Sequence, residues 1–294
     1  MKIRQIVLFC AAAVIIPAML FADDAKREEL RYNQIQQKAS HNSYQRREPI
    51  LTQLKDFKIR CLEFDIHSRP SAPAGDWWVY HNKKGDATVC SRLSECFAAV
   101  AQFHQAEPEH EVLTIFFDVD GLGAPGHKKS DFYEEIEKIF PNPSILKPGD
   151  LMAACPGAKN LQESVTQPGC GWPRLKDLKG KFIFVISGGK SSFAIPSYDL
   201  DAELVFLVSE SGRPEKIHSA PDRVFFNMPG PDPFARTSRE AGFVSRCYWL
   251  DSREKYEKAM GLGANLLATD DLDPGQFPWT TTSQPDGWPF KIIR

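Results

Sequence analysis

The stretch Ile59-Arg60-Cys61-Leu62-Glu63-Phe64-Asp65-Ile66-His67 alternates between apolar and polar residues over most of its length, which is the pattern of a β-strand. Successive side chains of a strand point to opposite faces, so Leu62 and Phe64 share one face and Glu63 and Asp65 share the other. Two carboxylates on one face, two residues apart, repel each other if they are buried without a cation. The stretch therefore predicts a strand that brings two acids to a place where positive charge is needed.

Histidines end the strand candidates on both sides of this stretch. Before it, Lys38-Ala39-Ser40-His41-Asn42-Ser43-Tyr44 follows Ile35-Gln36-Gln37 and ends in polar residues suited to a loop. After it, Trp77-Trp78-Val79-Tyr80-His81 is a further strand candidate that ends in a histidine. A histidine, a pair of acids and a second histidine, each at the end of a strand candidate, are typical of a metal-assisted phosphodiester site.

Composition and charge describe an ordinary globular protein. The chain has 294 residues, of which 42% are hydrophobic and 25% charged, which is enough for a large core in one domain or two small ones. Its net charge is −2 and its Lys and Arg residues are scattered, which argues against a nucleic-acid partner.

The N-terminal residues have the layout of a secretory signal. Lys2 and Arg4 precede an apolar run at 6–21, after which charged residues resume. A membrane anchor is the alternative, but the run is shorter than the roughly 20 apolar residues that a spanning helix needs. We expect residues 1–22 to be a signal peptide and residues 23–294 to be a single exported domain without a transmembrane segment, secreted or periplasmic.

Cysteine usage fits an oxidising compartment, because six of the seven cysteines lie after residue 22. Two local bridges are expected, since each pair lies within a single stretch between strands: Cys90 with Cys96, and Cys155 with Cys170. Cys61 and Cys247 lie within apolar strand candidates and are expected to be buried thiols. The cysteine spacing is not that of a zinc site.

Apolar segments typical of strands recur along the chain, at 35–40, 59–66, 77–80, 112–119, 181–187, 204–209, 223–228, 242–249 and 265–269. Helix candidates lie between several of them, at 92–104, 130–140 and 253–262. This alternation predicts an α/β fold with a parallel sheet, and the number of strands fits a single irregular (β/α)8 TIM barrel. A doubly wound open sheet is the alternative, but it normally shows a Gly-rich first turn, which this sequence lacks. The tail 274–294 is expected to pack over the outside.

Active sites of such barrels gather at the C-terminal ends of the strands. The candidate residues fall at these ends: His41 and Asn42 after the first strand, Glu63 and Asp65 in the second, His81 after the third and Asp118 in the fourth. Four of them offer oxygen atoms, the ligands that Ca²⁺ and Mg²⁺ prefer: Asn42, Glu63, Asp65 and Asp118. Alternatively, a single acid at a strand end caps a helix or pairs with an arginine.

Several motifs together resemble one family, the calcium-dependent phosphatidylinositol-specific phospholipases C, including their bacterial secreted branch. The resemblance runs from about residue 36 to 272 and is carried by the stretches at 40–44, 60–65 and 79–81, by 90–96, 171–181 and 263–270. It implies a single TIM barrel of the phospholipase C-like phosphodiesterase type.

The resemblance also implies roles for individual residues. His41 and His81 fall on the two catalytic histidines, and Arg246 and Tyr248 fall on a pair that holds the inositol headgroup in eukaryotic relatives. The metal ligands fall on Asn42, Glu63, Asp65 and Asp118. In the implied reaction the inositol 2-hydroxyl attacks its own phosphodiester while a divalent cation offsets the growing charge. Glu63 or a histidine takes the proton, His41 holds a phosphoryl oxygen, and His81 protonates the leaving oxygen.

Three departures from the family pattern bear on the metal and the substrate. Asp118 stands where the family usually has the longer Glu, and Asp120 stands where bacterial members often have Lys. The segment 182–187 lacks the lysines with which eukaryotic members hold extra ring phosphates. Unphosphorylated phosphatidylinositol, or another diester, is therefore the expected substrate.

The resulting prediction is a secreted, metal-dependent phosphoric diester hydrolase of the phospholipase C type, with Ca²⁺ as the cofactor and Mg²⁺ as the alternative. It is expected to act as a monomer on a phospholipid or small phosphodiester at a membrane surface. A glycerophosphodiester phosphodiesterase or a phospholipase D-like lyase on the same barrel is one alternative. A non-catalytic exported lipid-binding barrel is another, raised by Asp118 and Asp120.

Overall fold

The computed structural model describes residues 25–69, 71–120, 126–187, 199–209 and 216–293. The predicted signal peptide, residues 1–22, lies outside the described residues. Within the described ranges, no helix is both long and apolar enough to cross a bilayer.

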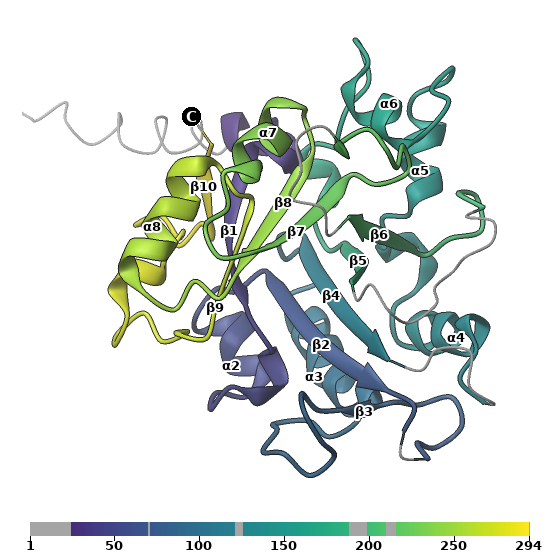
Figure 1. Cartoon of the computed structure of the whole chain (residues 1–294), viewed down its shortest axis with the longest axis vertical. Helices are drawn as coiled ribbons and strands as arrows, with labels where there is room; N and C mark the ends of the chain where they lie inside the picture. Colours follow the sequence, from purple (N-terminus) through teal and green to yellow (C-terminus); the bar gives the residue numbers. More distant parts are fainter. Residues whose placement is uncertain (1–24, 70, 121–125, 188–198, 210–215, 294) are drawn as a thin grey trace, which may run out of the picture.

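Eight parallel strands close into a barrel, as predicted (Figure 1). They are β1 (Ile35–Ser40), β2 (Cys61–His67), β4 (Leu113–Asp120), β5 (Phe182–Ser187), β6 (Val205–Ser209), β7 (Phe225–Pro229), β8 (Val244–Tyr248) and β9 (Leu266–Thr269). Each strand pairs with the next in this order, and β1 pairs with both β9 and β2, which closes the ring. Three of the strands, β1, β5 and β9, are buried along their whole length, and the others are buried except near their C-terminal ends, which explains the nearly continuous apolar sequences of several of them.

The prediction that His81 ends a third barrel strand is wrong. The preceding strand, β3 (Trp78–Val79), runs antiparallel to the end of β2, with Ile66 opposite Val79, and takes no part in the parallel ring. β4 follows β2 in the barrel instead, and the register places Asp118 opposite Asp65. The physical reason is the length of β3. Two paired residues are too few to form a strand of the barrel wall, and a short apolar run in the sequence does not reveal whether the strand runs parallel or antiparallel to its neighbour.

The helices cover the outside of the barrel. Those at the three predicted positions are α3 (Leu93–Ala106), α4 (Lys129–Ile139) and α8 (Arg253–Leu262). Four shorter ones were not predicted: α2 (Ile50–Lys55), α5 (Pro148–Ala153), α6 (Leu161–Thr166) and α7 (Phe234–Glu240). Each spans two turns or less, too short for a helical period to stand out in the sequence. The tail packs over the outside, as expected, and its strand β10 (Phe290–Ile292) pairs antiparallel with the first half of β1.

The core has two clusters: one joins the barrel interior to the packing under α5 to α8, and the other lies between the barrel wall and the helices α2 to α4. Inside, Phe116 and Phe225 meet edge to face with ring centroids 6.3 Å apart. Outside, Phe117 packs on Phe97 of α3 at 6.0 Å. Apolar packing fills the barrel up to the C-terminal ends of the strands, where charged side chains take over the inward positions.

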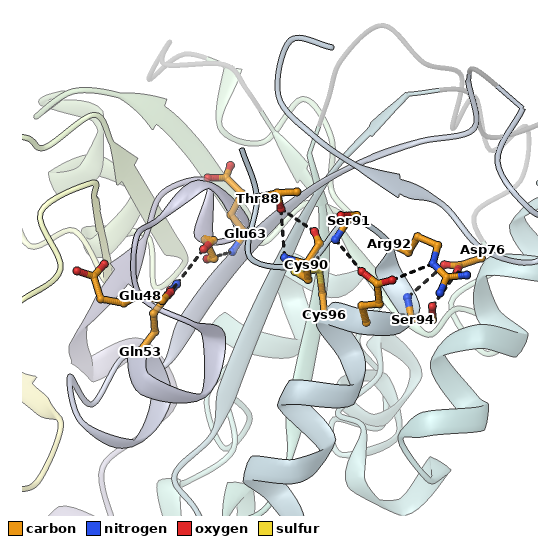
Figure 2. The surroundings of a disulfide bond; sticks show 12 residues. Glu48, Gln53, Glu63, Asp76, Thr88, Cys90, Ser91, Arg92, Ser94 and Cys96 are labelled. Atoms are coloured by element: carbon orange, nitrogen blue, oxygen red, sulfur yellow. Dashed lines mark hydrogen bonds and ion pairs between the residues drawn. A yellow bond between two sulfur atoms is a disulfide. The ribbon is translucent and has the colours of Figure 1, made fainter. Parts of the chain in front are cut away.

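Both predicted disulfides are present. Cys90–Cys96 ties the segment before α3 to the helix, and Figure 2 shows the Thr88 hydroxyl hydrogen-bonded to the backbone of Cys90 beside it. The Val89 N–H donates to the Tyr44 carbonyl at 2.8 Å, so the bridged segment is also fixed to the loop after β1.

The second bridge, Cys155–Cys170, closes the excursion that contains α6 and begins just after the end of α5. Cys61 and Cys247 are buried free thiols, as predicted. Burial raises the pKa of each thiol to about 12, so neither is a reactive thiolate at neutral pH.

A histidine pair near the N-terminal ends of β4 and β5, in which His110 is buried and His104 half-buried, is expected to make the fold sensitive to acid. The Nδ1–H of His110 donates to the Glu111 carbonyl at 2.7 Å, so its Nε2 faces Nδ1 of His104 at 3.0 Å as an acceptor. Burial lowers the pKa of His110 to about 4, from 6.5. The folded state therefore binds this proton more weakly than the unfolded state.

We expect this part of the free energy of unfolding to be fully present above pH 6.5 and to be lost as the pH falls towards 4, by up to about 3 kcal/mol. Urea unfolding at a series of pH values measures it. In His110→Phe, which keeps ring contact with Phe103 and Phe182, the slope between these pH values should be shallower. An unchanged slope would contradict the assignment.

Candidate functional site

The turn after β1 is built to present His41 and Asn42. Asn42 adopts the left-handed conformation with φ of 46°, which Asn tolerates better than most residues. Its backbone N–H donates to Oε2 of Glu63 at 2.9 Å, while the Glu63 N–H donates to the Ser43 hydroxyl at 2.9 Å. These reciprocal bonds fix the turn to β2, so the first histidine and the first acid are held as one unit.

His41 is oriented by a carboxylate that the sequence did not single out. Its Nδ1 lies 2.8 Å from Oδ1 of Asp270, directly after β9, and Arg46 contacts the same oxygen at 2.8 Å. Burial alone would raise the pKa of Asp270, but the bond from His41 and the charge of Arg46 outweigh it and lower the pKa. The His41 ring also stacks on Tyr248, with centroids 5.8 Å apart and an angle of 19° between planes. Nδ1 is thereby engaged, which leaves Nε2 for substrate.

His81 reaches the site from the loop after β3. Its Nδ1 lies 2.9 Å from Oδ2 of Asp65, and its side chain is 45% exposed. The hydrogen bond to Asp65 raises the pKa of His81. Burial and the charge of Glu63 raise the pKa of Asp65, against the bond from His81. The pair therefore keeps its proton to a higher pH than a free histidine would, as suits an acid that protonates a leaving group.

Glu63 forms a buried ion pair inside the barrel mouth. Nη2 of Arg246 donates to its Oε2 at 2.6 Å, and Nη1 donates to the Asn227 side chain at 3.0 Å. Burial opposes ionisation of Glu63, but the charge of Arg246 outweighs it, so its pKa is lowered. Asn227 was not predicted, and no motif marks it. It pairs in register with Arg246 between β7 and β8, which only the sheet could reveal.

The remaining oxygen donors lie beside these pairs. Asp118, opposite Asp65 in the register, is exposed. Tyr44 donates from its hydroxyl to Oδ1 of Asn42 at 3.4 Å, and burial among the acids raises the pKa of Tyr44. The barrel thus brings Asn42, Glu63, Asp65 and Asp118 to one end, together with His41, His81, Arg246 and Tyr248.

The donor chemistry of this end fits a hard divalent cation. Carboxylate and amide oxygens are the ligands that Ca²⁺ prefers, and the pKa of Asp65 is raised first by burial and then by the negative charge of Glu63. In the described part of the chain, no three or more His, Cys, Asp or Glu side chains are grouped closely enough to hold an ion as they stand. Glu63 and Asp65 instead contact Arg246 and His81.

Comparison with known proteins supports the fold. No family profile matches the chain, and no curated protein matches it by sequence. A calcium-dependent phosphoinositol-specific phospholipase C from a Gram-negative Pseudomonas species, described as a myoinositol complex, superposes with a TM-score of 0.76 at 22% identity over 92% of this chain and 98% of that one. A Ca²⁺-dependent phosphatidylinositol-specific phospholipase C from Streptomyces antibioticus gives 0.66 at 18% identity over 82% and 94%. In its fold, this chain resembles the calcium-dependent phosphatidylinositol-specific phospholipases C of bacteria.

Proposed function

We propose that the protein is an exported, calcium-dependent phosphodiesterase that cleaves the headgroup of phosphatidylinositol by the phospholipase C reaction. The observation that carries this proposal is the meeting of two His–Asp pairs, His41–Asp270 and His81–Asp65, at one barrel mouth. The buried Glu63–Arg246 pair lies at the same mouth. The fold supports it, because both similar structures described above are phospholipases C of this kind.

The residues divide the work by their protonation and burial. His41, held through Nδ1 by Asp270, offers Nε2 to a phosphoryl oxygen. Glu63, which stays ionised beside Arg246, would accept the proton of the attacking hydroxyl, with a histidine as the alternative. His81 protonates the leaving oxygen, since its bond to Asp65 keeps it protonated to higher pH.

Asn42, Glu63, Asp65 and Asp118 would hold the cation. A bound Ca²⁺ would offset the charge that develops on the phosphoryl oxygens. Arg246 and Tyr248 would face the headgroup, Tyr248 with the ring that stacks on His41. The acids Asp118 and Asp120, both exposed on β4, disfavour a ring that carries additional phosphates. The two disulfides support export.

The test is hydrolysis of phosphatidylinositol in vesicles with Ca²⁺, with Mg²⁺ and with chelator. We expect a cyclic inositol phosphate and diacylglycerol with Ca²⁺ and no turnover with chelator. Release of glycerophosphate or of phosphatidic acid would favour the glycerophosphodiesterase or phospholipase D-like alternative. Vesicle binding without any product would favour the non-catalytic barrel.

Asp118→Ala should raise the Ca²⁺ concentration for half-maximal turnover by about 10-fold or more, because one of the four oxygen ligands is lost. Asp118→Glu, with the longer side chain usual in the family, should lower it. Titration of activity with buffered Ca²⁺ measures both. Asp150→Ala, on α5, is the control and should leave the Ca²⁺ requirement unchanged. Equal Ca²⁺ requirements for Asp118→Ala and the parent would remove Asp118 from the ligand set.

A further inference from the structure

Lys38 is a buried lysine on β1 that the proposed mechanism does not use. It is 2% exposed, and its Nζ donates to the Leu272 carbonyl at 2.5 Å and to the Thr280 hydroxyl at 2.8 Å. Neither partner carries a charge. Burial lowers the pKa of Lys38 to about 7, against the attraction of Asp273 and Asp271. A buried amine of this kind costs stability, and an apolar side chain of similar size would in general serve the fold better.

The segment that Lys38 holds is the one that carries Asp270. The Thr269 carbonyl at the end of β9 accepts from the His41 N–H at 3.1 Å, and Asp270 follows with its carboxylate on the His41 ring. Two residues later the buried Leu272 turns its carbonyl to Lys38. The chain is thus tied twice, to His41 directly after β1 and to Lys38 on β1, and Asp270, whose own N–H donates to Asp251 at 2.7 Å, lies between the two ties.

Asp270 needs such a constraint, because it does not lie on a strand and its side chain is 39% exposed. His41 and Arg46 contact the same carboxylate oxygen, each at 2.8 Å. Arg46 is itself held, because its side chain is 14% exposed and its Nε donates to the Asn42 carbonyl at 3.3 Å, so a turn displaced from β1 would leave the carboxylate on Arg46 alone. The position of the backbone on both sides of Asp270 therefore decides whether its carboxylate bonds to His41 as well as to Arg46.

We propose that Lys38 is a positioning residue, whose amine fixes the turn after β9 so that the Asp270 carboxylate stays on Nδ1 of His41. The role of Lys38 in turnover rests on the function proposed above. Its effect on the His41–Asp270 hydrogen bond does not, and can be measured in a protein without any activity.

Gln36 supplies a matched control. It lies two residues before Lys38 on the same face of β1, is also 2% exposed, and also donates to backbone carbonyls, those of Met260 and Ala264, each at 2.9 Å. These carbonyls belong to the end of α8 and to the segment before β9. They lie at the N-terminal end of β9, whereas Asp270 follows its C-terminal end. Replacing Gln36 therefore removes equivalent bonds without touching the turn.

The experiment compares Lys38→Met with Gln36→Met, with Asp270→Asn as reference. Proton NMR follows the Nδ1–H of His41, whose hydrogen bond to Asp270 protects it from exchange with water. We expect Lys38→Met and Asp270→Asn to lose this slowly exchanging resonance and Gln36→Met to keep it. Thermal unfolding should show Lys38→Met as stable as the parent or more so, and Gln36→Met as less stable.

Turnover of phosphatidylinositol vesicles is the second readout. Lys38→Met should lower kcat by about 10- to 100-fold with little change in KM, as expected for a misplaced catalytic group. Thr280→Val, which removes one acceptor of the Lys38 amine, should give the same changes in weaker form and tests the proposal even if Lys38→Met does not fold. Retention of the His41 resonance in Lys38→Met, or its equal loss in Gln36→Met, would overturn the proposal. A parent without turnover but with these NMR differences would sink the proposed function and leave the role of Lys38 intact.

Discussion

His41→Ala should lower the turnover of phosphatidylinositol by about 10²- to 10⁴-fold, the range over which a positioned acid–base group contributes. The ring is held on one side by Asp270 and on its face by Tyr248, which fixes the place of its Nε2, and alanine offers no nitrogen there. The measurement is the initial rate of cyclic inositol phosphate release at saturating Ca²⁺. Stability should change little, because His41 lies at the mouth and outside the two apolar clusters.

His218→Gln is the matched control for this prediction. His218 is more exposed than His41, but it is likewise hydrogen-bonded through Nδ1, in its case to Gln162 of α6, away from the barrel mouth. It should retain the parental rate. Asp270→Asn should fall between the two, because the ring keeps its place but loses the carboxylate that orients it. Equal rates for His41→Ala and the parent would mean that the reaction, if any, does not use this histidine.

Arg246→Met should destabilise the fold by about 3–5 kcal/mol, because it leaves Glu63 as a buried charge without its partner. Arg246 is 1% exposed, and Glu63 has no other cation within bonding distance among its described contacts. Urea unfolding measures the loss. The double variant Glu63→Gln with Arg246→Met should recover most of it, since a neutral amide is less costly to bury than an unpaired carboxylate.

An exposed ion pair serves as the comparison. Arg253 and Glu257 on α8 are 65% and 61% exposed, so Arg253→Met should cost no more than about 0.5 kcal/mol. The pH dependence adds a second check. Because the pKa of Glu63 is lowered from 4.5, the stabilisation by the Arg246 pair is present above that pH and is lost as the pH falls further. If Arg246→Met and Arg253→Met lowered the free energy of unfolding by equally small amounts, the buried Glu63–Arg246 pair would not stabilise the fold as described.

The sequence alone was enough to predict the barrel and the end of it at which the candidate residues lie. Strands buried on both faces leave long apolar runs, and these runs located the eight barrel strands to within a few residues. The acids at the strand ends could be predicted to meet because parallel strands bring their carboxyl ends to one edge. The local disulfides followed from short separations of 6 and 15 residues.

Other features could not be predicted because they depend on contacts between distant parts of the chain. Asp270 reaches His41 across 229 residues, and Arg246 reaches Glu63 across 183. The resemblance to a known family marked Arg246, but neither Asp270 nor Asn227 stood out. The direction of β3 was likewise decided by the strand it pairs with.

Periodicity and strand-end position thus determined the barrel, the edge at which the site lies and the two acids on β2. The tertiary structure alone decided which partner each buried group meets: Arg246 for Glu63, His81 for Asp65, Asp270 for His41 and the uncharged Leu272 carbonyl for Lys38. The physical reason is that apolar burial repeats along the chain at a fixed period, whereas the pairing of buried charges follows only from which strand ends the closed barrel sets side by side.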